Sequence, residues 1–322
     1  MKTLITGITG FTGIHLAKYL LSPDRRKDNI DLYGIDIVRD MSKDDQEVLD
    51  KAEVFACDIL NKEETEKTVD KIKPDRIFHL AGLTFAPNSY QSPEKFYLTN
   101  VFGTVNLLEA VKQLGINPLI HIACSSAEYG LILENENPVT ENSHFRPISP
   151  YGISKLAQDM GGYQYYKNHR LKIIRTRAFN ITGPGEKENF VCSNFARQIA
   201  LIEKDKQEAT IYVGNLDSKR DFVDIRDIVK AYWLAVDKGI SGEVYNLCSG
   251  KAYSIGEMLN ILLQMTKEDI VVKQDPERMR SSDIPLQVGS FEKFHKQTGW
   301  EPVISLKETL KDLLNYWRQK VQ

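Results

Sequence analysis

The residues best suited to acid–base chemistry are a tyrosine and a lysine four positions apart, Tyr151 and Lys155. On a helix this spacing places both side chains on one face, and Pro150 just before them is typical of a helix start. A neighbouring ammonium group lowers the pKa of a tyrosine, so we expect Tyr151 to exchange a proton with a substrate hydroxyl or alkoxide near neutral pH. Such pairs are common on helices, and only the wider sequence gives this one meaning.

A third candidate is Ser125, which follows a short apolar stretch that predicts a strand, Leu119–Ala123. Ligands of open α/β sheets bind at the carboxyl ends of strands. We therefore expect the Ser125 hydroxyl to hold a substrate oxygen against Tyr151. The competing interpretation is an ordinary turn serine.

A glycine loop near the start of the chain predicts a dinucleotide site. It follows a predicted strand, precedes a predicted helix, and has the sequence Gly7-Ile8-Thr9-Gly10-Phe11-Thr12-Gly13. Glycines there let the backbone approach a pyrophosphate, and the helix N-terminus offers N–H groups and a partial positive charge. The loop is predicted to bind through Gly7, Thr9, Gly10, Phe11, Thr12 and Gly13.

Other strand ends belong to the same predicted cofactor site. Asp36 ends the second strand, where a carboxylate accepts hydrogen bonds from the adenosine ribose and repels a 2′-phosphate. It favours NAD(H), although Arg39 nearby leaves NADP(H) open. His79 is interpreted as a core histidine rather than a catalyst. The remaining predicted cofactor contacts are Ile37, Asp58, Ile59, Leu80, Ala81, Gly82, Tyr151 and Lys155.

The elements that must position these residues alternate between strand and helix, which predicts a parallel, doubly wound α/β sheet with helices on both faces. The segment Val38–Lys51 is polar and is predicted to be a loop. Predicted strands are Thr3–Thr6, Asp31–Ile35, Glu53–Ala56, Arg76–Leu80, Leu119–Ala123, Lys172–Thr176, Thr210–Val213 and Glu243–Leu247. Predicted helices are Thr12–Leu21, Lys62–Lys71, Pro93–Leu114, Pro150–Asn168, Glu188–Lys204, Asp227–Val236, Ser254–Met265 and Ser305–Trp317.

Composition narrows the function class. The 322 residues carry a net charge of -2, which argues against a nucleic-acid-binding protein. The four cysteines have no zinc-like or CxxC spacing, so no metal site is expected. No apolar run approaches the length of a membrane span, and the first predicted strand begins too early for a signal peptide. We expect a cytoplasmic enzyme without a membrane partner.

Taken together, these motifs resemble the extended short-chain dehydrogenases/reductases. The resemblance rests on the glycine loop, on Ser125 ahead of Tyr129-Gly130, on Tyr151 with Lys155, and on Asn100-Val-Phe-Gly-Thr104. It implies a Rossmann-like domain of residues 1–180, with 221–248 returning to it. A smaller nucleotide-sugar domain would comprise 181–220 and 249–322. It also implies a homodimer formed by the long helices Pro93–Leu114 and Pro150–Asn168, with Met160, Tyr163, Tyr165 and Tyr166 as candidate apolar surface.

The C-terminal half is similar to the GDP-sugar branch of that family, which includes dehydratases and 4-ketoreductases. The similar segments are Arg177–Gly185, Asn189–Val191, Val213–Phe222 and Arg278–Pro285. By this resemblance Ser126 and Asn180 contact the sugar-nucleotide, and Arg220 and Arg280 hold the diphosphate, as paired arginines can. Asp283 reaches the ribose. The implied guanine-site residues are Phe190, Val191, Asn215 and Lys219.

One position separates a reductase from a dehydratase. A 4,6-dehydratase needs a carboxylate base, which in this branch stands two residues before the tyrosine of Tyr129-Gly130. Ala127 occupies that position, and Glu128 is displaced by one, which on a strand end turns it the other way. We therefore expect NAD(P)H-dependent reduction of GDP-4-keto-6-deoxy-D-mannose, giving GDP-D-rhamnose. A 4,6-dehydratase or 4-epimerase with tightly bound NAD, and a non-catalytic NAD-sensing protein, remain the alternatives.

Overall fold

A computed structural model describes residues 1–37, 42–278 and 284–321. Its centre is a seven-stranded sheet in which every neighbouring pair is parallel. The order β10-β6-β5-β4-β1-β2-β3 reverses direction between β1 and β4, which is where ligands bind in doubly wound sheets. The strands are β1 (Lys2–Thr6), β2 (Asp31–Asp36), β3 (Glu53–Ala56), β4 (Arg76–His79), β5 (Leu119–Ser125), β6 (Lys172–Ala178) and β10 (Val244–Leu247).

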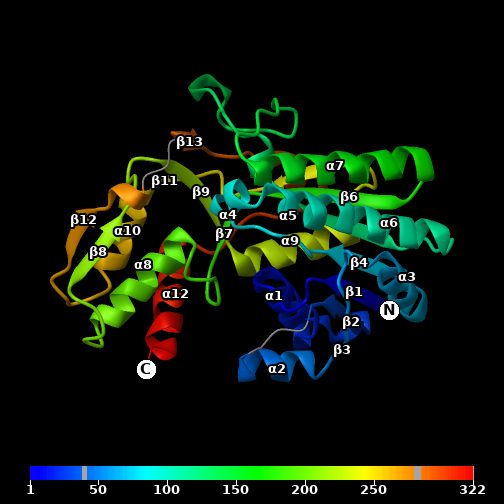
Figure 1. Ribbon diagram of the computed structural model, residues 1–322, viewed down its shortest axis with the longest axis horizontal. Helices are drawn as coiled ribbons and strands as arrows, with labels where there is room; N and C mark the ends of the chain where they lie inside the picture. Colours follow the sequence, from blue (N-terminus) through cyan, green and yellow to red (C-terminus); the bar gives the residue numbers. More distant parts are fainter. Residues whose placement is uncertain (38–41, 279–283, 322) are drawn as a thin grey trace.

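Helices cover both faces of this sheet (Figure 1). One face packs against α1 (Phe11–Leu20), α9 (Ile225–Lys238) and α11 (Glu292–Thr298) through one apolar cluster. The other packs against α3 (Lys62–Ile72), α6 (Gly103–Gln113) and α7 (Pro150–His169) through a second. Because both faces are buried, the central strands are almost continuously apolar. The predicted fold class is confirmed.

A smaller lobe lies to one side of the sheet (Figure 1), with its own apolar core. Strand β9 (Lys219–Asp224) pairs there with β7 (Asn180–Thr182), β11 (Ala252–Ser254) and β13 (Leu286–Gln287). A second small sheet joins β8 (Thr210–Val213) to β12 (Val271–Gln274). The helices of this lobe are α8 (Val191–Ile202), α10 (Ile255–Leu263) and α12 (Leu306–Lys320).

The structure differs from the sequence prediction in several places. Part of the predicted loop Val38–Lys51 is helix α2 (Lys43–Leu49), which begins at the side-chain cap of Ser42; Arg39 lies outside the described residues. The predicted helix Pro93–Leu114 is divided into α5 (Pro93–Tyr97), a π-helical turn η2 (Leu98–Phe102) and α6. A further short helix, α4 (Ala86–Gln91), was not predicted.

The predicted domain boundary also needs correction. Phe294 and Trp300 pack in the same apolar cluster as α1 and α9, so the segment around α11 lies with the large sheet and not with the smaller lobe. The chain passes between the large sheet and the smaller lobe more often than the predicted domain division implies.

In the described part of the chain, no helix combines the length and apolar character that crossing a membrane requires.

Candidate active site

The glycine loop packs directly against the end of β4. Gly7 has φ +74°, and a Cβ built on it would lie 2.8 Å from the Ala81 nitrogen. A Cβ on Gly13 would lie 2.2 Å from the Gly7 oxygen, whereas one on Gly10 meets only that oxygen, at 3.2 Å. Gly10 is the N-cap of α1 and makes no side-chain cap. The loop therefore has two positions closed to any side chain and an uncapped helix end, which suits a bound pyrophosphate.

Asp36 joins the end of β2 to this loop. Its carboxylate accepts hydrogen bonds from the backbone nitrogen and hydroxyl of Thr9, at 2.9 and 2.6 Å, and from the nitrogen of exposed Ile37, at 2.8 Å. Phe11 and Thr12 begin α1 beside them. The carboxylate thus lies at the carboxyl edge of the sheet, beside the glycine loop.

The remaining predicted cofactor residues lie along the same edge. Asp58 is exposed and accepts from the Leu60 nitrogen at 2.9 Å, while Ile59 is buried. Leu80, Ala81 and Gly82 follow β4 directly, and a Cβ on Gly82 would lie 2.9 Å from Asn100 Oδ1. His79 is buried between hydroxyl groups of Thr6 and Thr104, as expected of a core histidine; burial lowers its pKa to about 3.

The three predicted catalytic residues lie at the end of β5 and in the first two turns of α7. Ser125 ends β5, and its hydroxyl is hydrogen-bonded to the phenol of Tyr151. Tyr151 lies in the first turn of α7, which begins at Pro150 with Ser149 as its cap. Lys155, one turn further on, donates to the Ala123 carbonyl oxygen at 2.9 Å and to Gln158 Oε1 at 2.7 Å.

The protonation of Tyr151 differs from the sequence expectation. Burial raises the pKa of Tyr151 to about 12, against the opposing effect of the Ser125 hydrogen bond. Burial also lowers the pKa of Lys155. The predicted lowering of the tyrosine pKa is therefore wrong for this arrangement, because desolvation outweighs the other influences on the phenol. Tyr151 holds its proton at neutral pH and can act as an acid.

Glu128 points into the interior, but strand alternation is not the reason, because Ser126–Glu128 form a 3-10 turn after β5 and not a strand end. It is fully buried, accepts from the Ser125 nitrogen at 2.9 Å, and lies 3.2 Å from Arg177 Nε. Arg177 also pairs with Asp159, which in turn pairs with Arg175. The two carboxylates and two guanidinium groups form a buried ion cluster that supports the turn carrying Ser125.

The predicted substrate residues converge on the junction of the two lobes. Asn180 opens β7 and donates to the Asp221 carbonyl oxygen at 2.8 Å. Phe190 caps α8, whose first residue is Val191, and its ring meets Phe85 edge-on at 5.3 Å. Ser126 is buried, and Gln287 donates to its carbonyl oxygen at 3.1 Å.

The remaining substrate candidates lie on β9 and the turn before it. Asn215 donates to Ser218 Oγ at 2.9 Å and accepts from the Asp217 nitrogen, so it shapes this turn. Lys219 is exposed at the start of β9. Arg220 donates to the carbonyl oxygens of Lys219 and Ile284. Arg280 and Asp283 lie outside the described residues, so their predicted roles stay predictions.

Phe85 and Gln158 were missed from the sequence. Gln158 lies three residues after Lys155, a spacing that places neighbours on one helix face, so a signal for it was available. Phe85 comes close to Phe190 only through the fold, because 105 positions of chain separate the two aromatic residues, and no local pattern predicts that contact.

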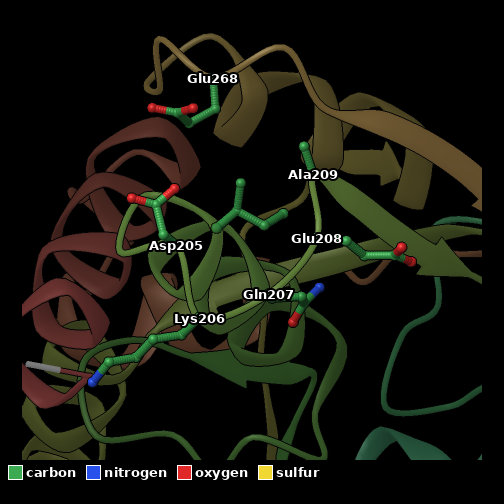
Figure 2. Close-up of a pocket in the computed structure, with 7 residues that line it drawn as sticks. Asp205, Lys206, Gln207, Glu208, Ala209 and Glu268 are labelled. Atoms are coloured by element: carbon green, nitrogen blue, oxygen red, sulfur yellow. The ribbon is translucent and has the colours of Figure 1, made fainter.

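A separate hollow in the smaller lobe holds none of these residues. Figure 2 shows its acidic and basic side chains pointing in different directions and not toward a common centre. It is lined by Ile202, Asp205, Lys206, Gln207, Glu208, Ala209 and Glu268. Its shallow, divergent lining gives it no catalytic arrangement.

Comparison with known proteins agrees with the fold. The family model described as GDP-mannose 4,6 dehydratase matches residues 4–313. The chain is 35% identical over 249 residues to GDP-6-deoxy-D-mannose reductase of Pseudomonas aeruginosa, covering 77% of this chain and 82% of that protein. It is 32% identical over 292 residues to GDP-6-deoxy-D-talose 4-dehydrogenase of Aggregatibacter actinomycetemcomitans, covering 90% and 88%.

Among solved structures, RMD from Pseudomonas aeruginosa complexed with NADPH superposes with a TM-score of 0.85, at 30% identity and full coverage of both chains. The match therefore includes the large sheet and the smaller lobe together. The chain belongs to the GDP-mannose 4,6-dehydratase family of extended short-chain dehydrogenases/reductases.

Proposed function

We propose that this chain reduces the C4 ketone of GDP-4-keto-6-deoxy-D-mannose to a GDP-6-deoxyhexose, with GDP-D-rhamnose as the expected product. The observation that carries the proposal is Ala127, which stands in the turn after Ser125 where a dehydratase has its base, beside Tyr151, whose pKa is raised by burial. Ketone reduction needs one proton donor and no base at C5. The similarity to a GDP-6-deoxy-D-mannose reductase supports this reaction.

The proposed cofactor is NAD(H) or NADP(H). The closed positions at Gly7 and Gly13 and the uncapped start of α1 fit a pyrophosphate, and Asp36 fits the ribose hydroxyls. The carboxylate favours NAD(H), whereas the Pseudomonas aeruginosa structure contains NADPH. The reduced nicotinamide, when bound, supplies the hydride for C4.

The chain's own residues then supply one proton and hold the groups that exchange it. Tyr151 donates it to the C4 oxygen as that oxygen becomes an alkoxide. The Ser125 hydroxyl holds the same oxygen and the phenol in line, which limits the geometries that can react. The Lys155 ammonium donates to the Ala123 carbonyl oxygen and to Gln158. Its positive charge would stabilise the negative charge that develops on the C4 oxygen.

The nucleotide end of the substrate is assigned to the smaller lobe. We propose that Ser126 and Asn180 contact the sugar, that Arg220 and Arg280 hold the diphosphate, and that Asp283 binds the ribose. The proposed guanine contacts are Phe190, Val191, Asn215 and Lys219. Support for the sugar end comes from Asn180, which begins β7 two residues after Ala178, the last residue of the buried strand β6 that pairs with β5.

The proposed assembly is a homodimer. Exposed apolar side chains gather on the α5–α6 region and on α7, where Phe102 is 56%, Ile153 45% and Tyr163 41% exposed. Tyr165 faces inward and donates to Glu109 at 2.6 Å, so it does not contribute to this surface. All four cysteines are unpaired and buried, which fits the proposed cytoplasmic location.

The test is consumption of NADH or NADPH by the purified protein in the presence of GDP-4-keto-6-deoxymannose, followed by absorbance. A reductase consumes one cofactor molecule per sugar, and analysis of the product distinguishes rhamnose from talose configuration at C4. A dehydratase or epimerase regenerates its cofactor within each cycle, so sugar conversion without loss of NAD(P)H would overturn the proposal.

A further inference from the structure

Beneath the proposed catalytic residues lies a connected set of buried polar side chains, here called the Gln158 network. Its members are Lys155, Gln158, Thr104, His79 and Thr6, and none is more than 5% exposed. They come from β1, β4, α6 and α7, so the network joins the helix that carries Tyr151 to the strands that carry the glycine loop.

The chemistry of the groups fixes the direction of the bonds around Gln158. An ammonium group can only donate, so the Gln158 atom 2.7 Å from Lys155 Nζ is its carbonyl oxygen. The amide nitrogen therefore faces Thr104 Oγ1, at 2.7 Å. Thr104 gives its single hydroxyl proton to the Asn100 carbonyl oxygen, also at 2.7 Å. Its oxygen must then accept from both remaining neighbours.

The same reasoning fixes His79. Its Nε2 lies 2.8 Å from Thr104 Oγ1, which has no proton left to give, so Nε2 carries the hydrogen. Nδ1 then accepts from the Thr6 hydroxyl at 2.8 Å. Thr6 Oγ1 in turn accepts from the Ala81 nitrogen at 3.2 Å. Ala81 is the residue against which Gly7 packs.

The bonds of this set can run in one direction only, and Thr104 uses its donor and both acceptor positions. Such a network fixes geometry, because reversing one bond would leave a buried group unpaired. For Lys155 the result is specific. Of the residues that the structure describes, Ala123 and Gln158 are the two that accept from Nζ. The third N–H of the ammonium group is therefore left for another acceptor.

We propose that Gln158 is a positioning residue: it aims the Lys155 ammonium at the reacting groups, and Thr104 and His79 hold its amide in the required orientation. The network also ties the position of Lys155 to the backbone beneath the glycine loop. This role rests on the proposed function, since it is through the reaction that the aim of Lys155 matters.

The first experiment needs no turnover. In the ¹⁵N-labelled protein, the Lys155 ammonium should give a slowly exchanging ¹H–¹⁵N signal, identified by its loss in Lys155→Arg. Gln158→Met should accelerate its exchange by about tenfold or more, the size expected for losing a hydrogen bond to a charged group. Gln158→Glu keeps an acceptor and should retain the signal. Thr104→Val, which frees the Gln158 amide, should accelerate exchange as well.

The second experiment measures kinetics. Gln158→Met should lower kcat by about tenfold while leaving KM for the keto-sugar unchanged, the pattern of an interaction that matters in the transition state. The matched control is Gln198→Met, since Gln198 is also buried on a helix and bonds Asn194 and Gln207 instead. That variant should keep both kcat and the Lys155 signal.

The two readouts separate the possible failures. An unchanged Lys155 signal in Gln158→Met, or an equal loss of kcat in Gln198→Met, would overturn the positioning role. An inactive wild-type protein would overturn the proposed function alone, because the ammonium signal still decides whether Gln158 holds Lys155.

Discussion

At Tyr151, burial and the Ser125 hydrogen bond act on the phenol in opposite directions. Burial prevails and raises the pKa of Tyr151 to about 12, so the side chain keeps its proton across the physiological range. A donor is what ketone reduction requires at this position. An enzyme that begins by oxidising its substrate requires a phenolate instead, and the burial of Tyr151 works against that state.

Replacing Tyr151 by phenylalanine should remove this donor with little change in packing. We expect kcat to fall by about a hundredfold or more, within the range for loss of a general acid, while cofactor affinity stays the same. Initial rates and fluorescence titration with NAD(P)H measure the two quantities. Tyr163→Phe, on the exposed side of α7, is the control; equal rates for Tyr151→Phe and wild type would refute the assignment of the acid.

Asp36 offers a test of cofactor choice. Asp36→Asn removes the negative charge but keeps oxygen and nitrogen atoms beside Thr9. The ratio of the NADPH to the NADH dissociation constant should fall by about tenfold, since about 1.4 kcal/mol of repulsion of the 2′-phosphate is lost. Asp31→Asn, at the exposed start of the same strand, should leave the ratio unchanged. An unchanged ratio of dissociation constants in Asp36→Asn would show that the 2′ position of the adenosine ribose does not lie beside Asp36.

At the scale of elements, the predictable part of the site is the part that strand ends create. Gly7, Asp36, Gly82 and Ser125 lie at or just after the ends of four different strands, and a parallel sheet brings all such ends to one edge. The sequence could therefore predict these residues together. It could not predict the π-helical turn η2, which places buried Asn100 against Leu83 and Ser154, because the pattern there is that of a continuous helix.

The smaller lobe was harder to predict for a physical reason. Its strands β7, β11 and β13 have only two or three residues each and are joined through β9, so none shows a periodic pattern of its own. The segment around α11 was assigned to this lobe because it follows it in sequence. Phe294 and Trp300 instead complete the core beneath α9.

The glycine loop gives the element-scale prediction. Gly13→Ala should abolish measurable dinucleotide binding, because its Cβ would lie 2.2 Å from the Gly7 oxygen and force α1 away from the loop. Gly256→Ala, in the first turn of α10, meets its nearest atom at 3.4 Å and should bind cofactor normally. Calorimetric titration with NADH and NADPH measures both; normal binding by Gly13→Ala would show that this contact is not part of the site.

At the scale of the whole molecule, the buried carboxylate of Asp221 joins segments that are distant in the chain. Asp221 on β9 accepts hydrogen bonds from Ser249, Gly250 and Gly289. Glu186, after β7, accepts from Thr182 at 2.7 Å, and burial raises its pKa to about 8. The Asp221 contacts join β9 to the segments that follow β10 and β13, and the Glu186 contact stabilises the turn after β7, so the stability of the molecule should depend on the protonation of both carboxyl groups.

Glu186 makes this dependence testable. Between its ordinary pKa of 4.5 and its folded pKa of about 8, the folded chain binds more protons than the unfolded chain, so stability falls as pH rises through that window. Glu186→Gln keeps the Thr182 hydrogen bond but cannot ionise. Raising the pH from 5 to 8.5 should therefore lower the Tm of the wild type relative to the Tm of Glu186→Gln. Parallel Tm curves would contradict the buried, protonated state of Glu186.

In the proposed reaction, hydride moves in one direction, from the cofactor at the glycine loop to C4 of a GDP-linked keto-sugar. The most direct measurement uses cofactor deuterated at the transferable position of the nicotinamide, with the product examined by NMR and mass spectrometry. We expect one deuterium at C4 per product molecule and none from solvent at C5. Deuterium from heavy water at C5, or its absence from C4, would contradict it.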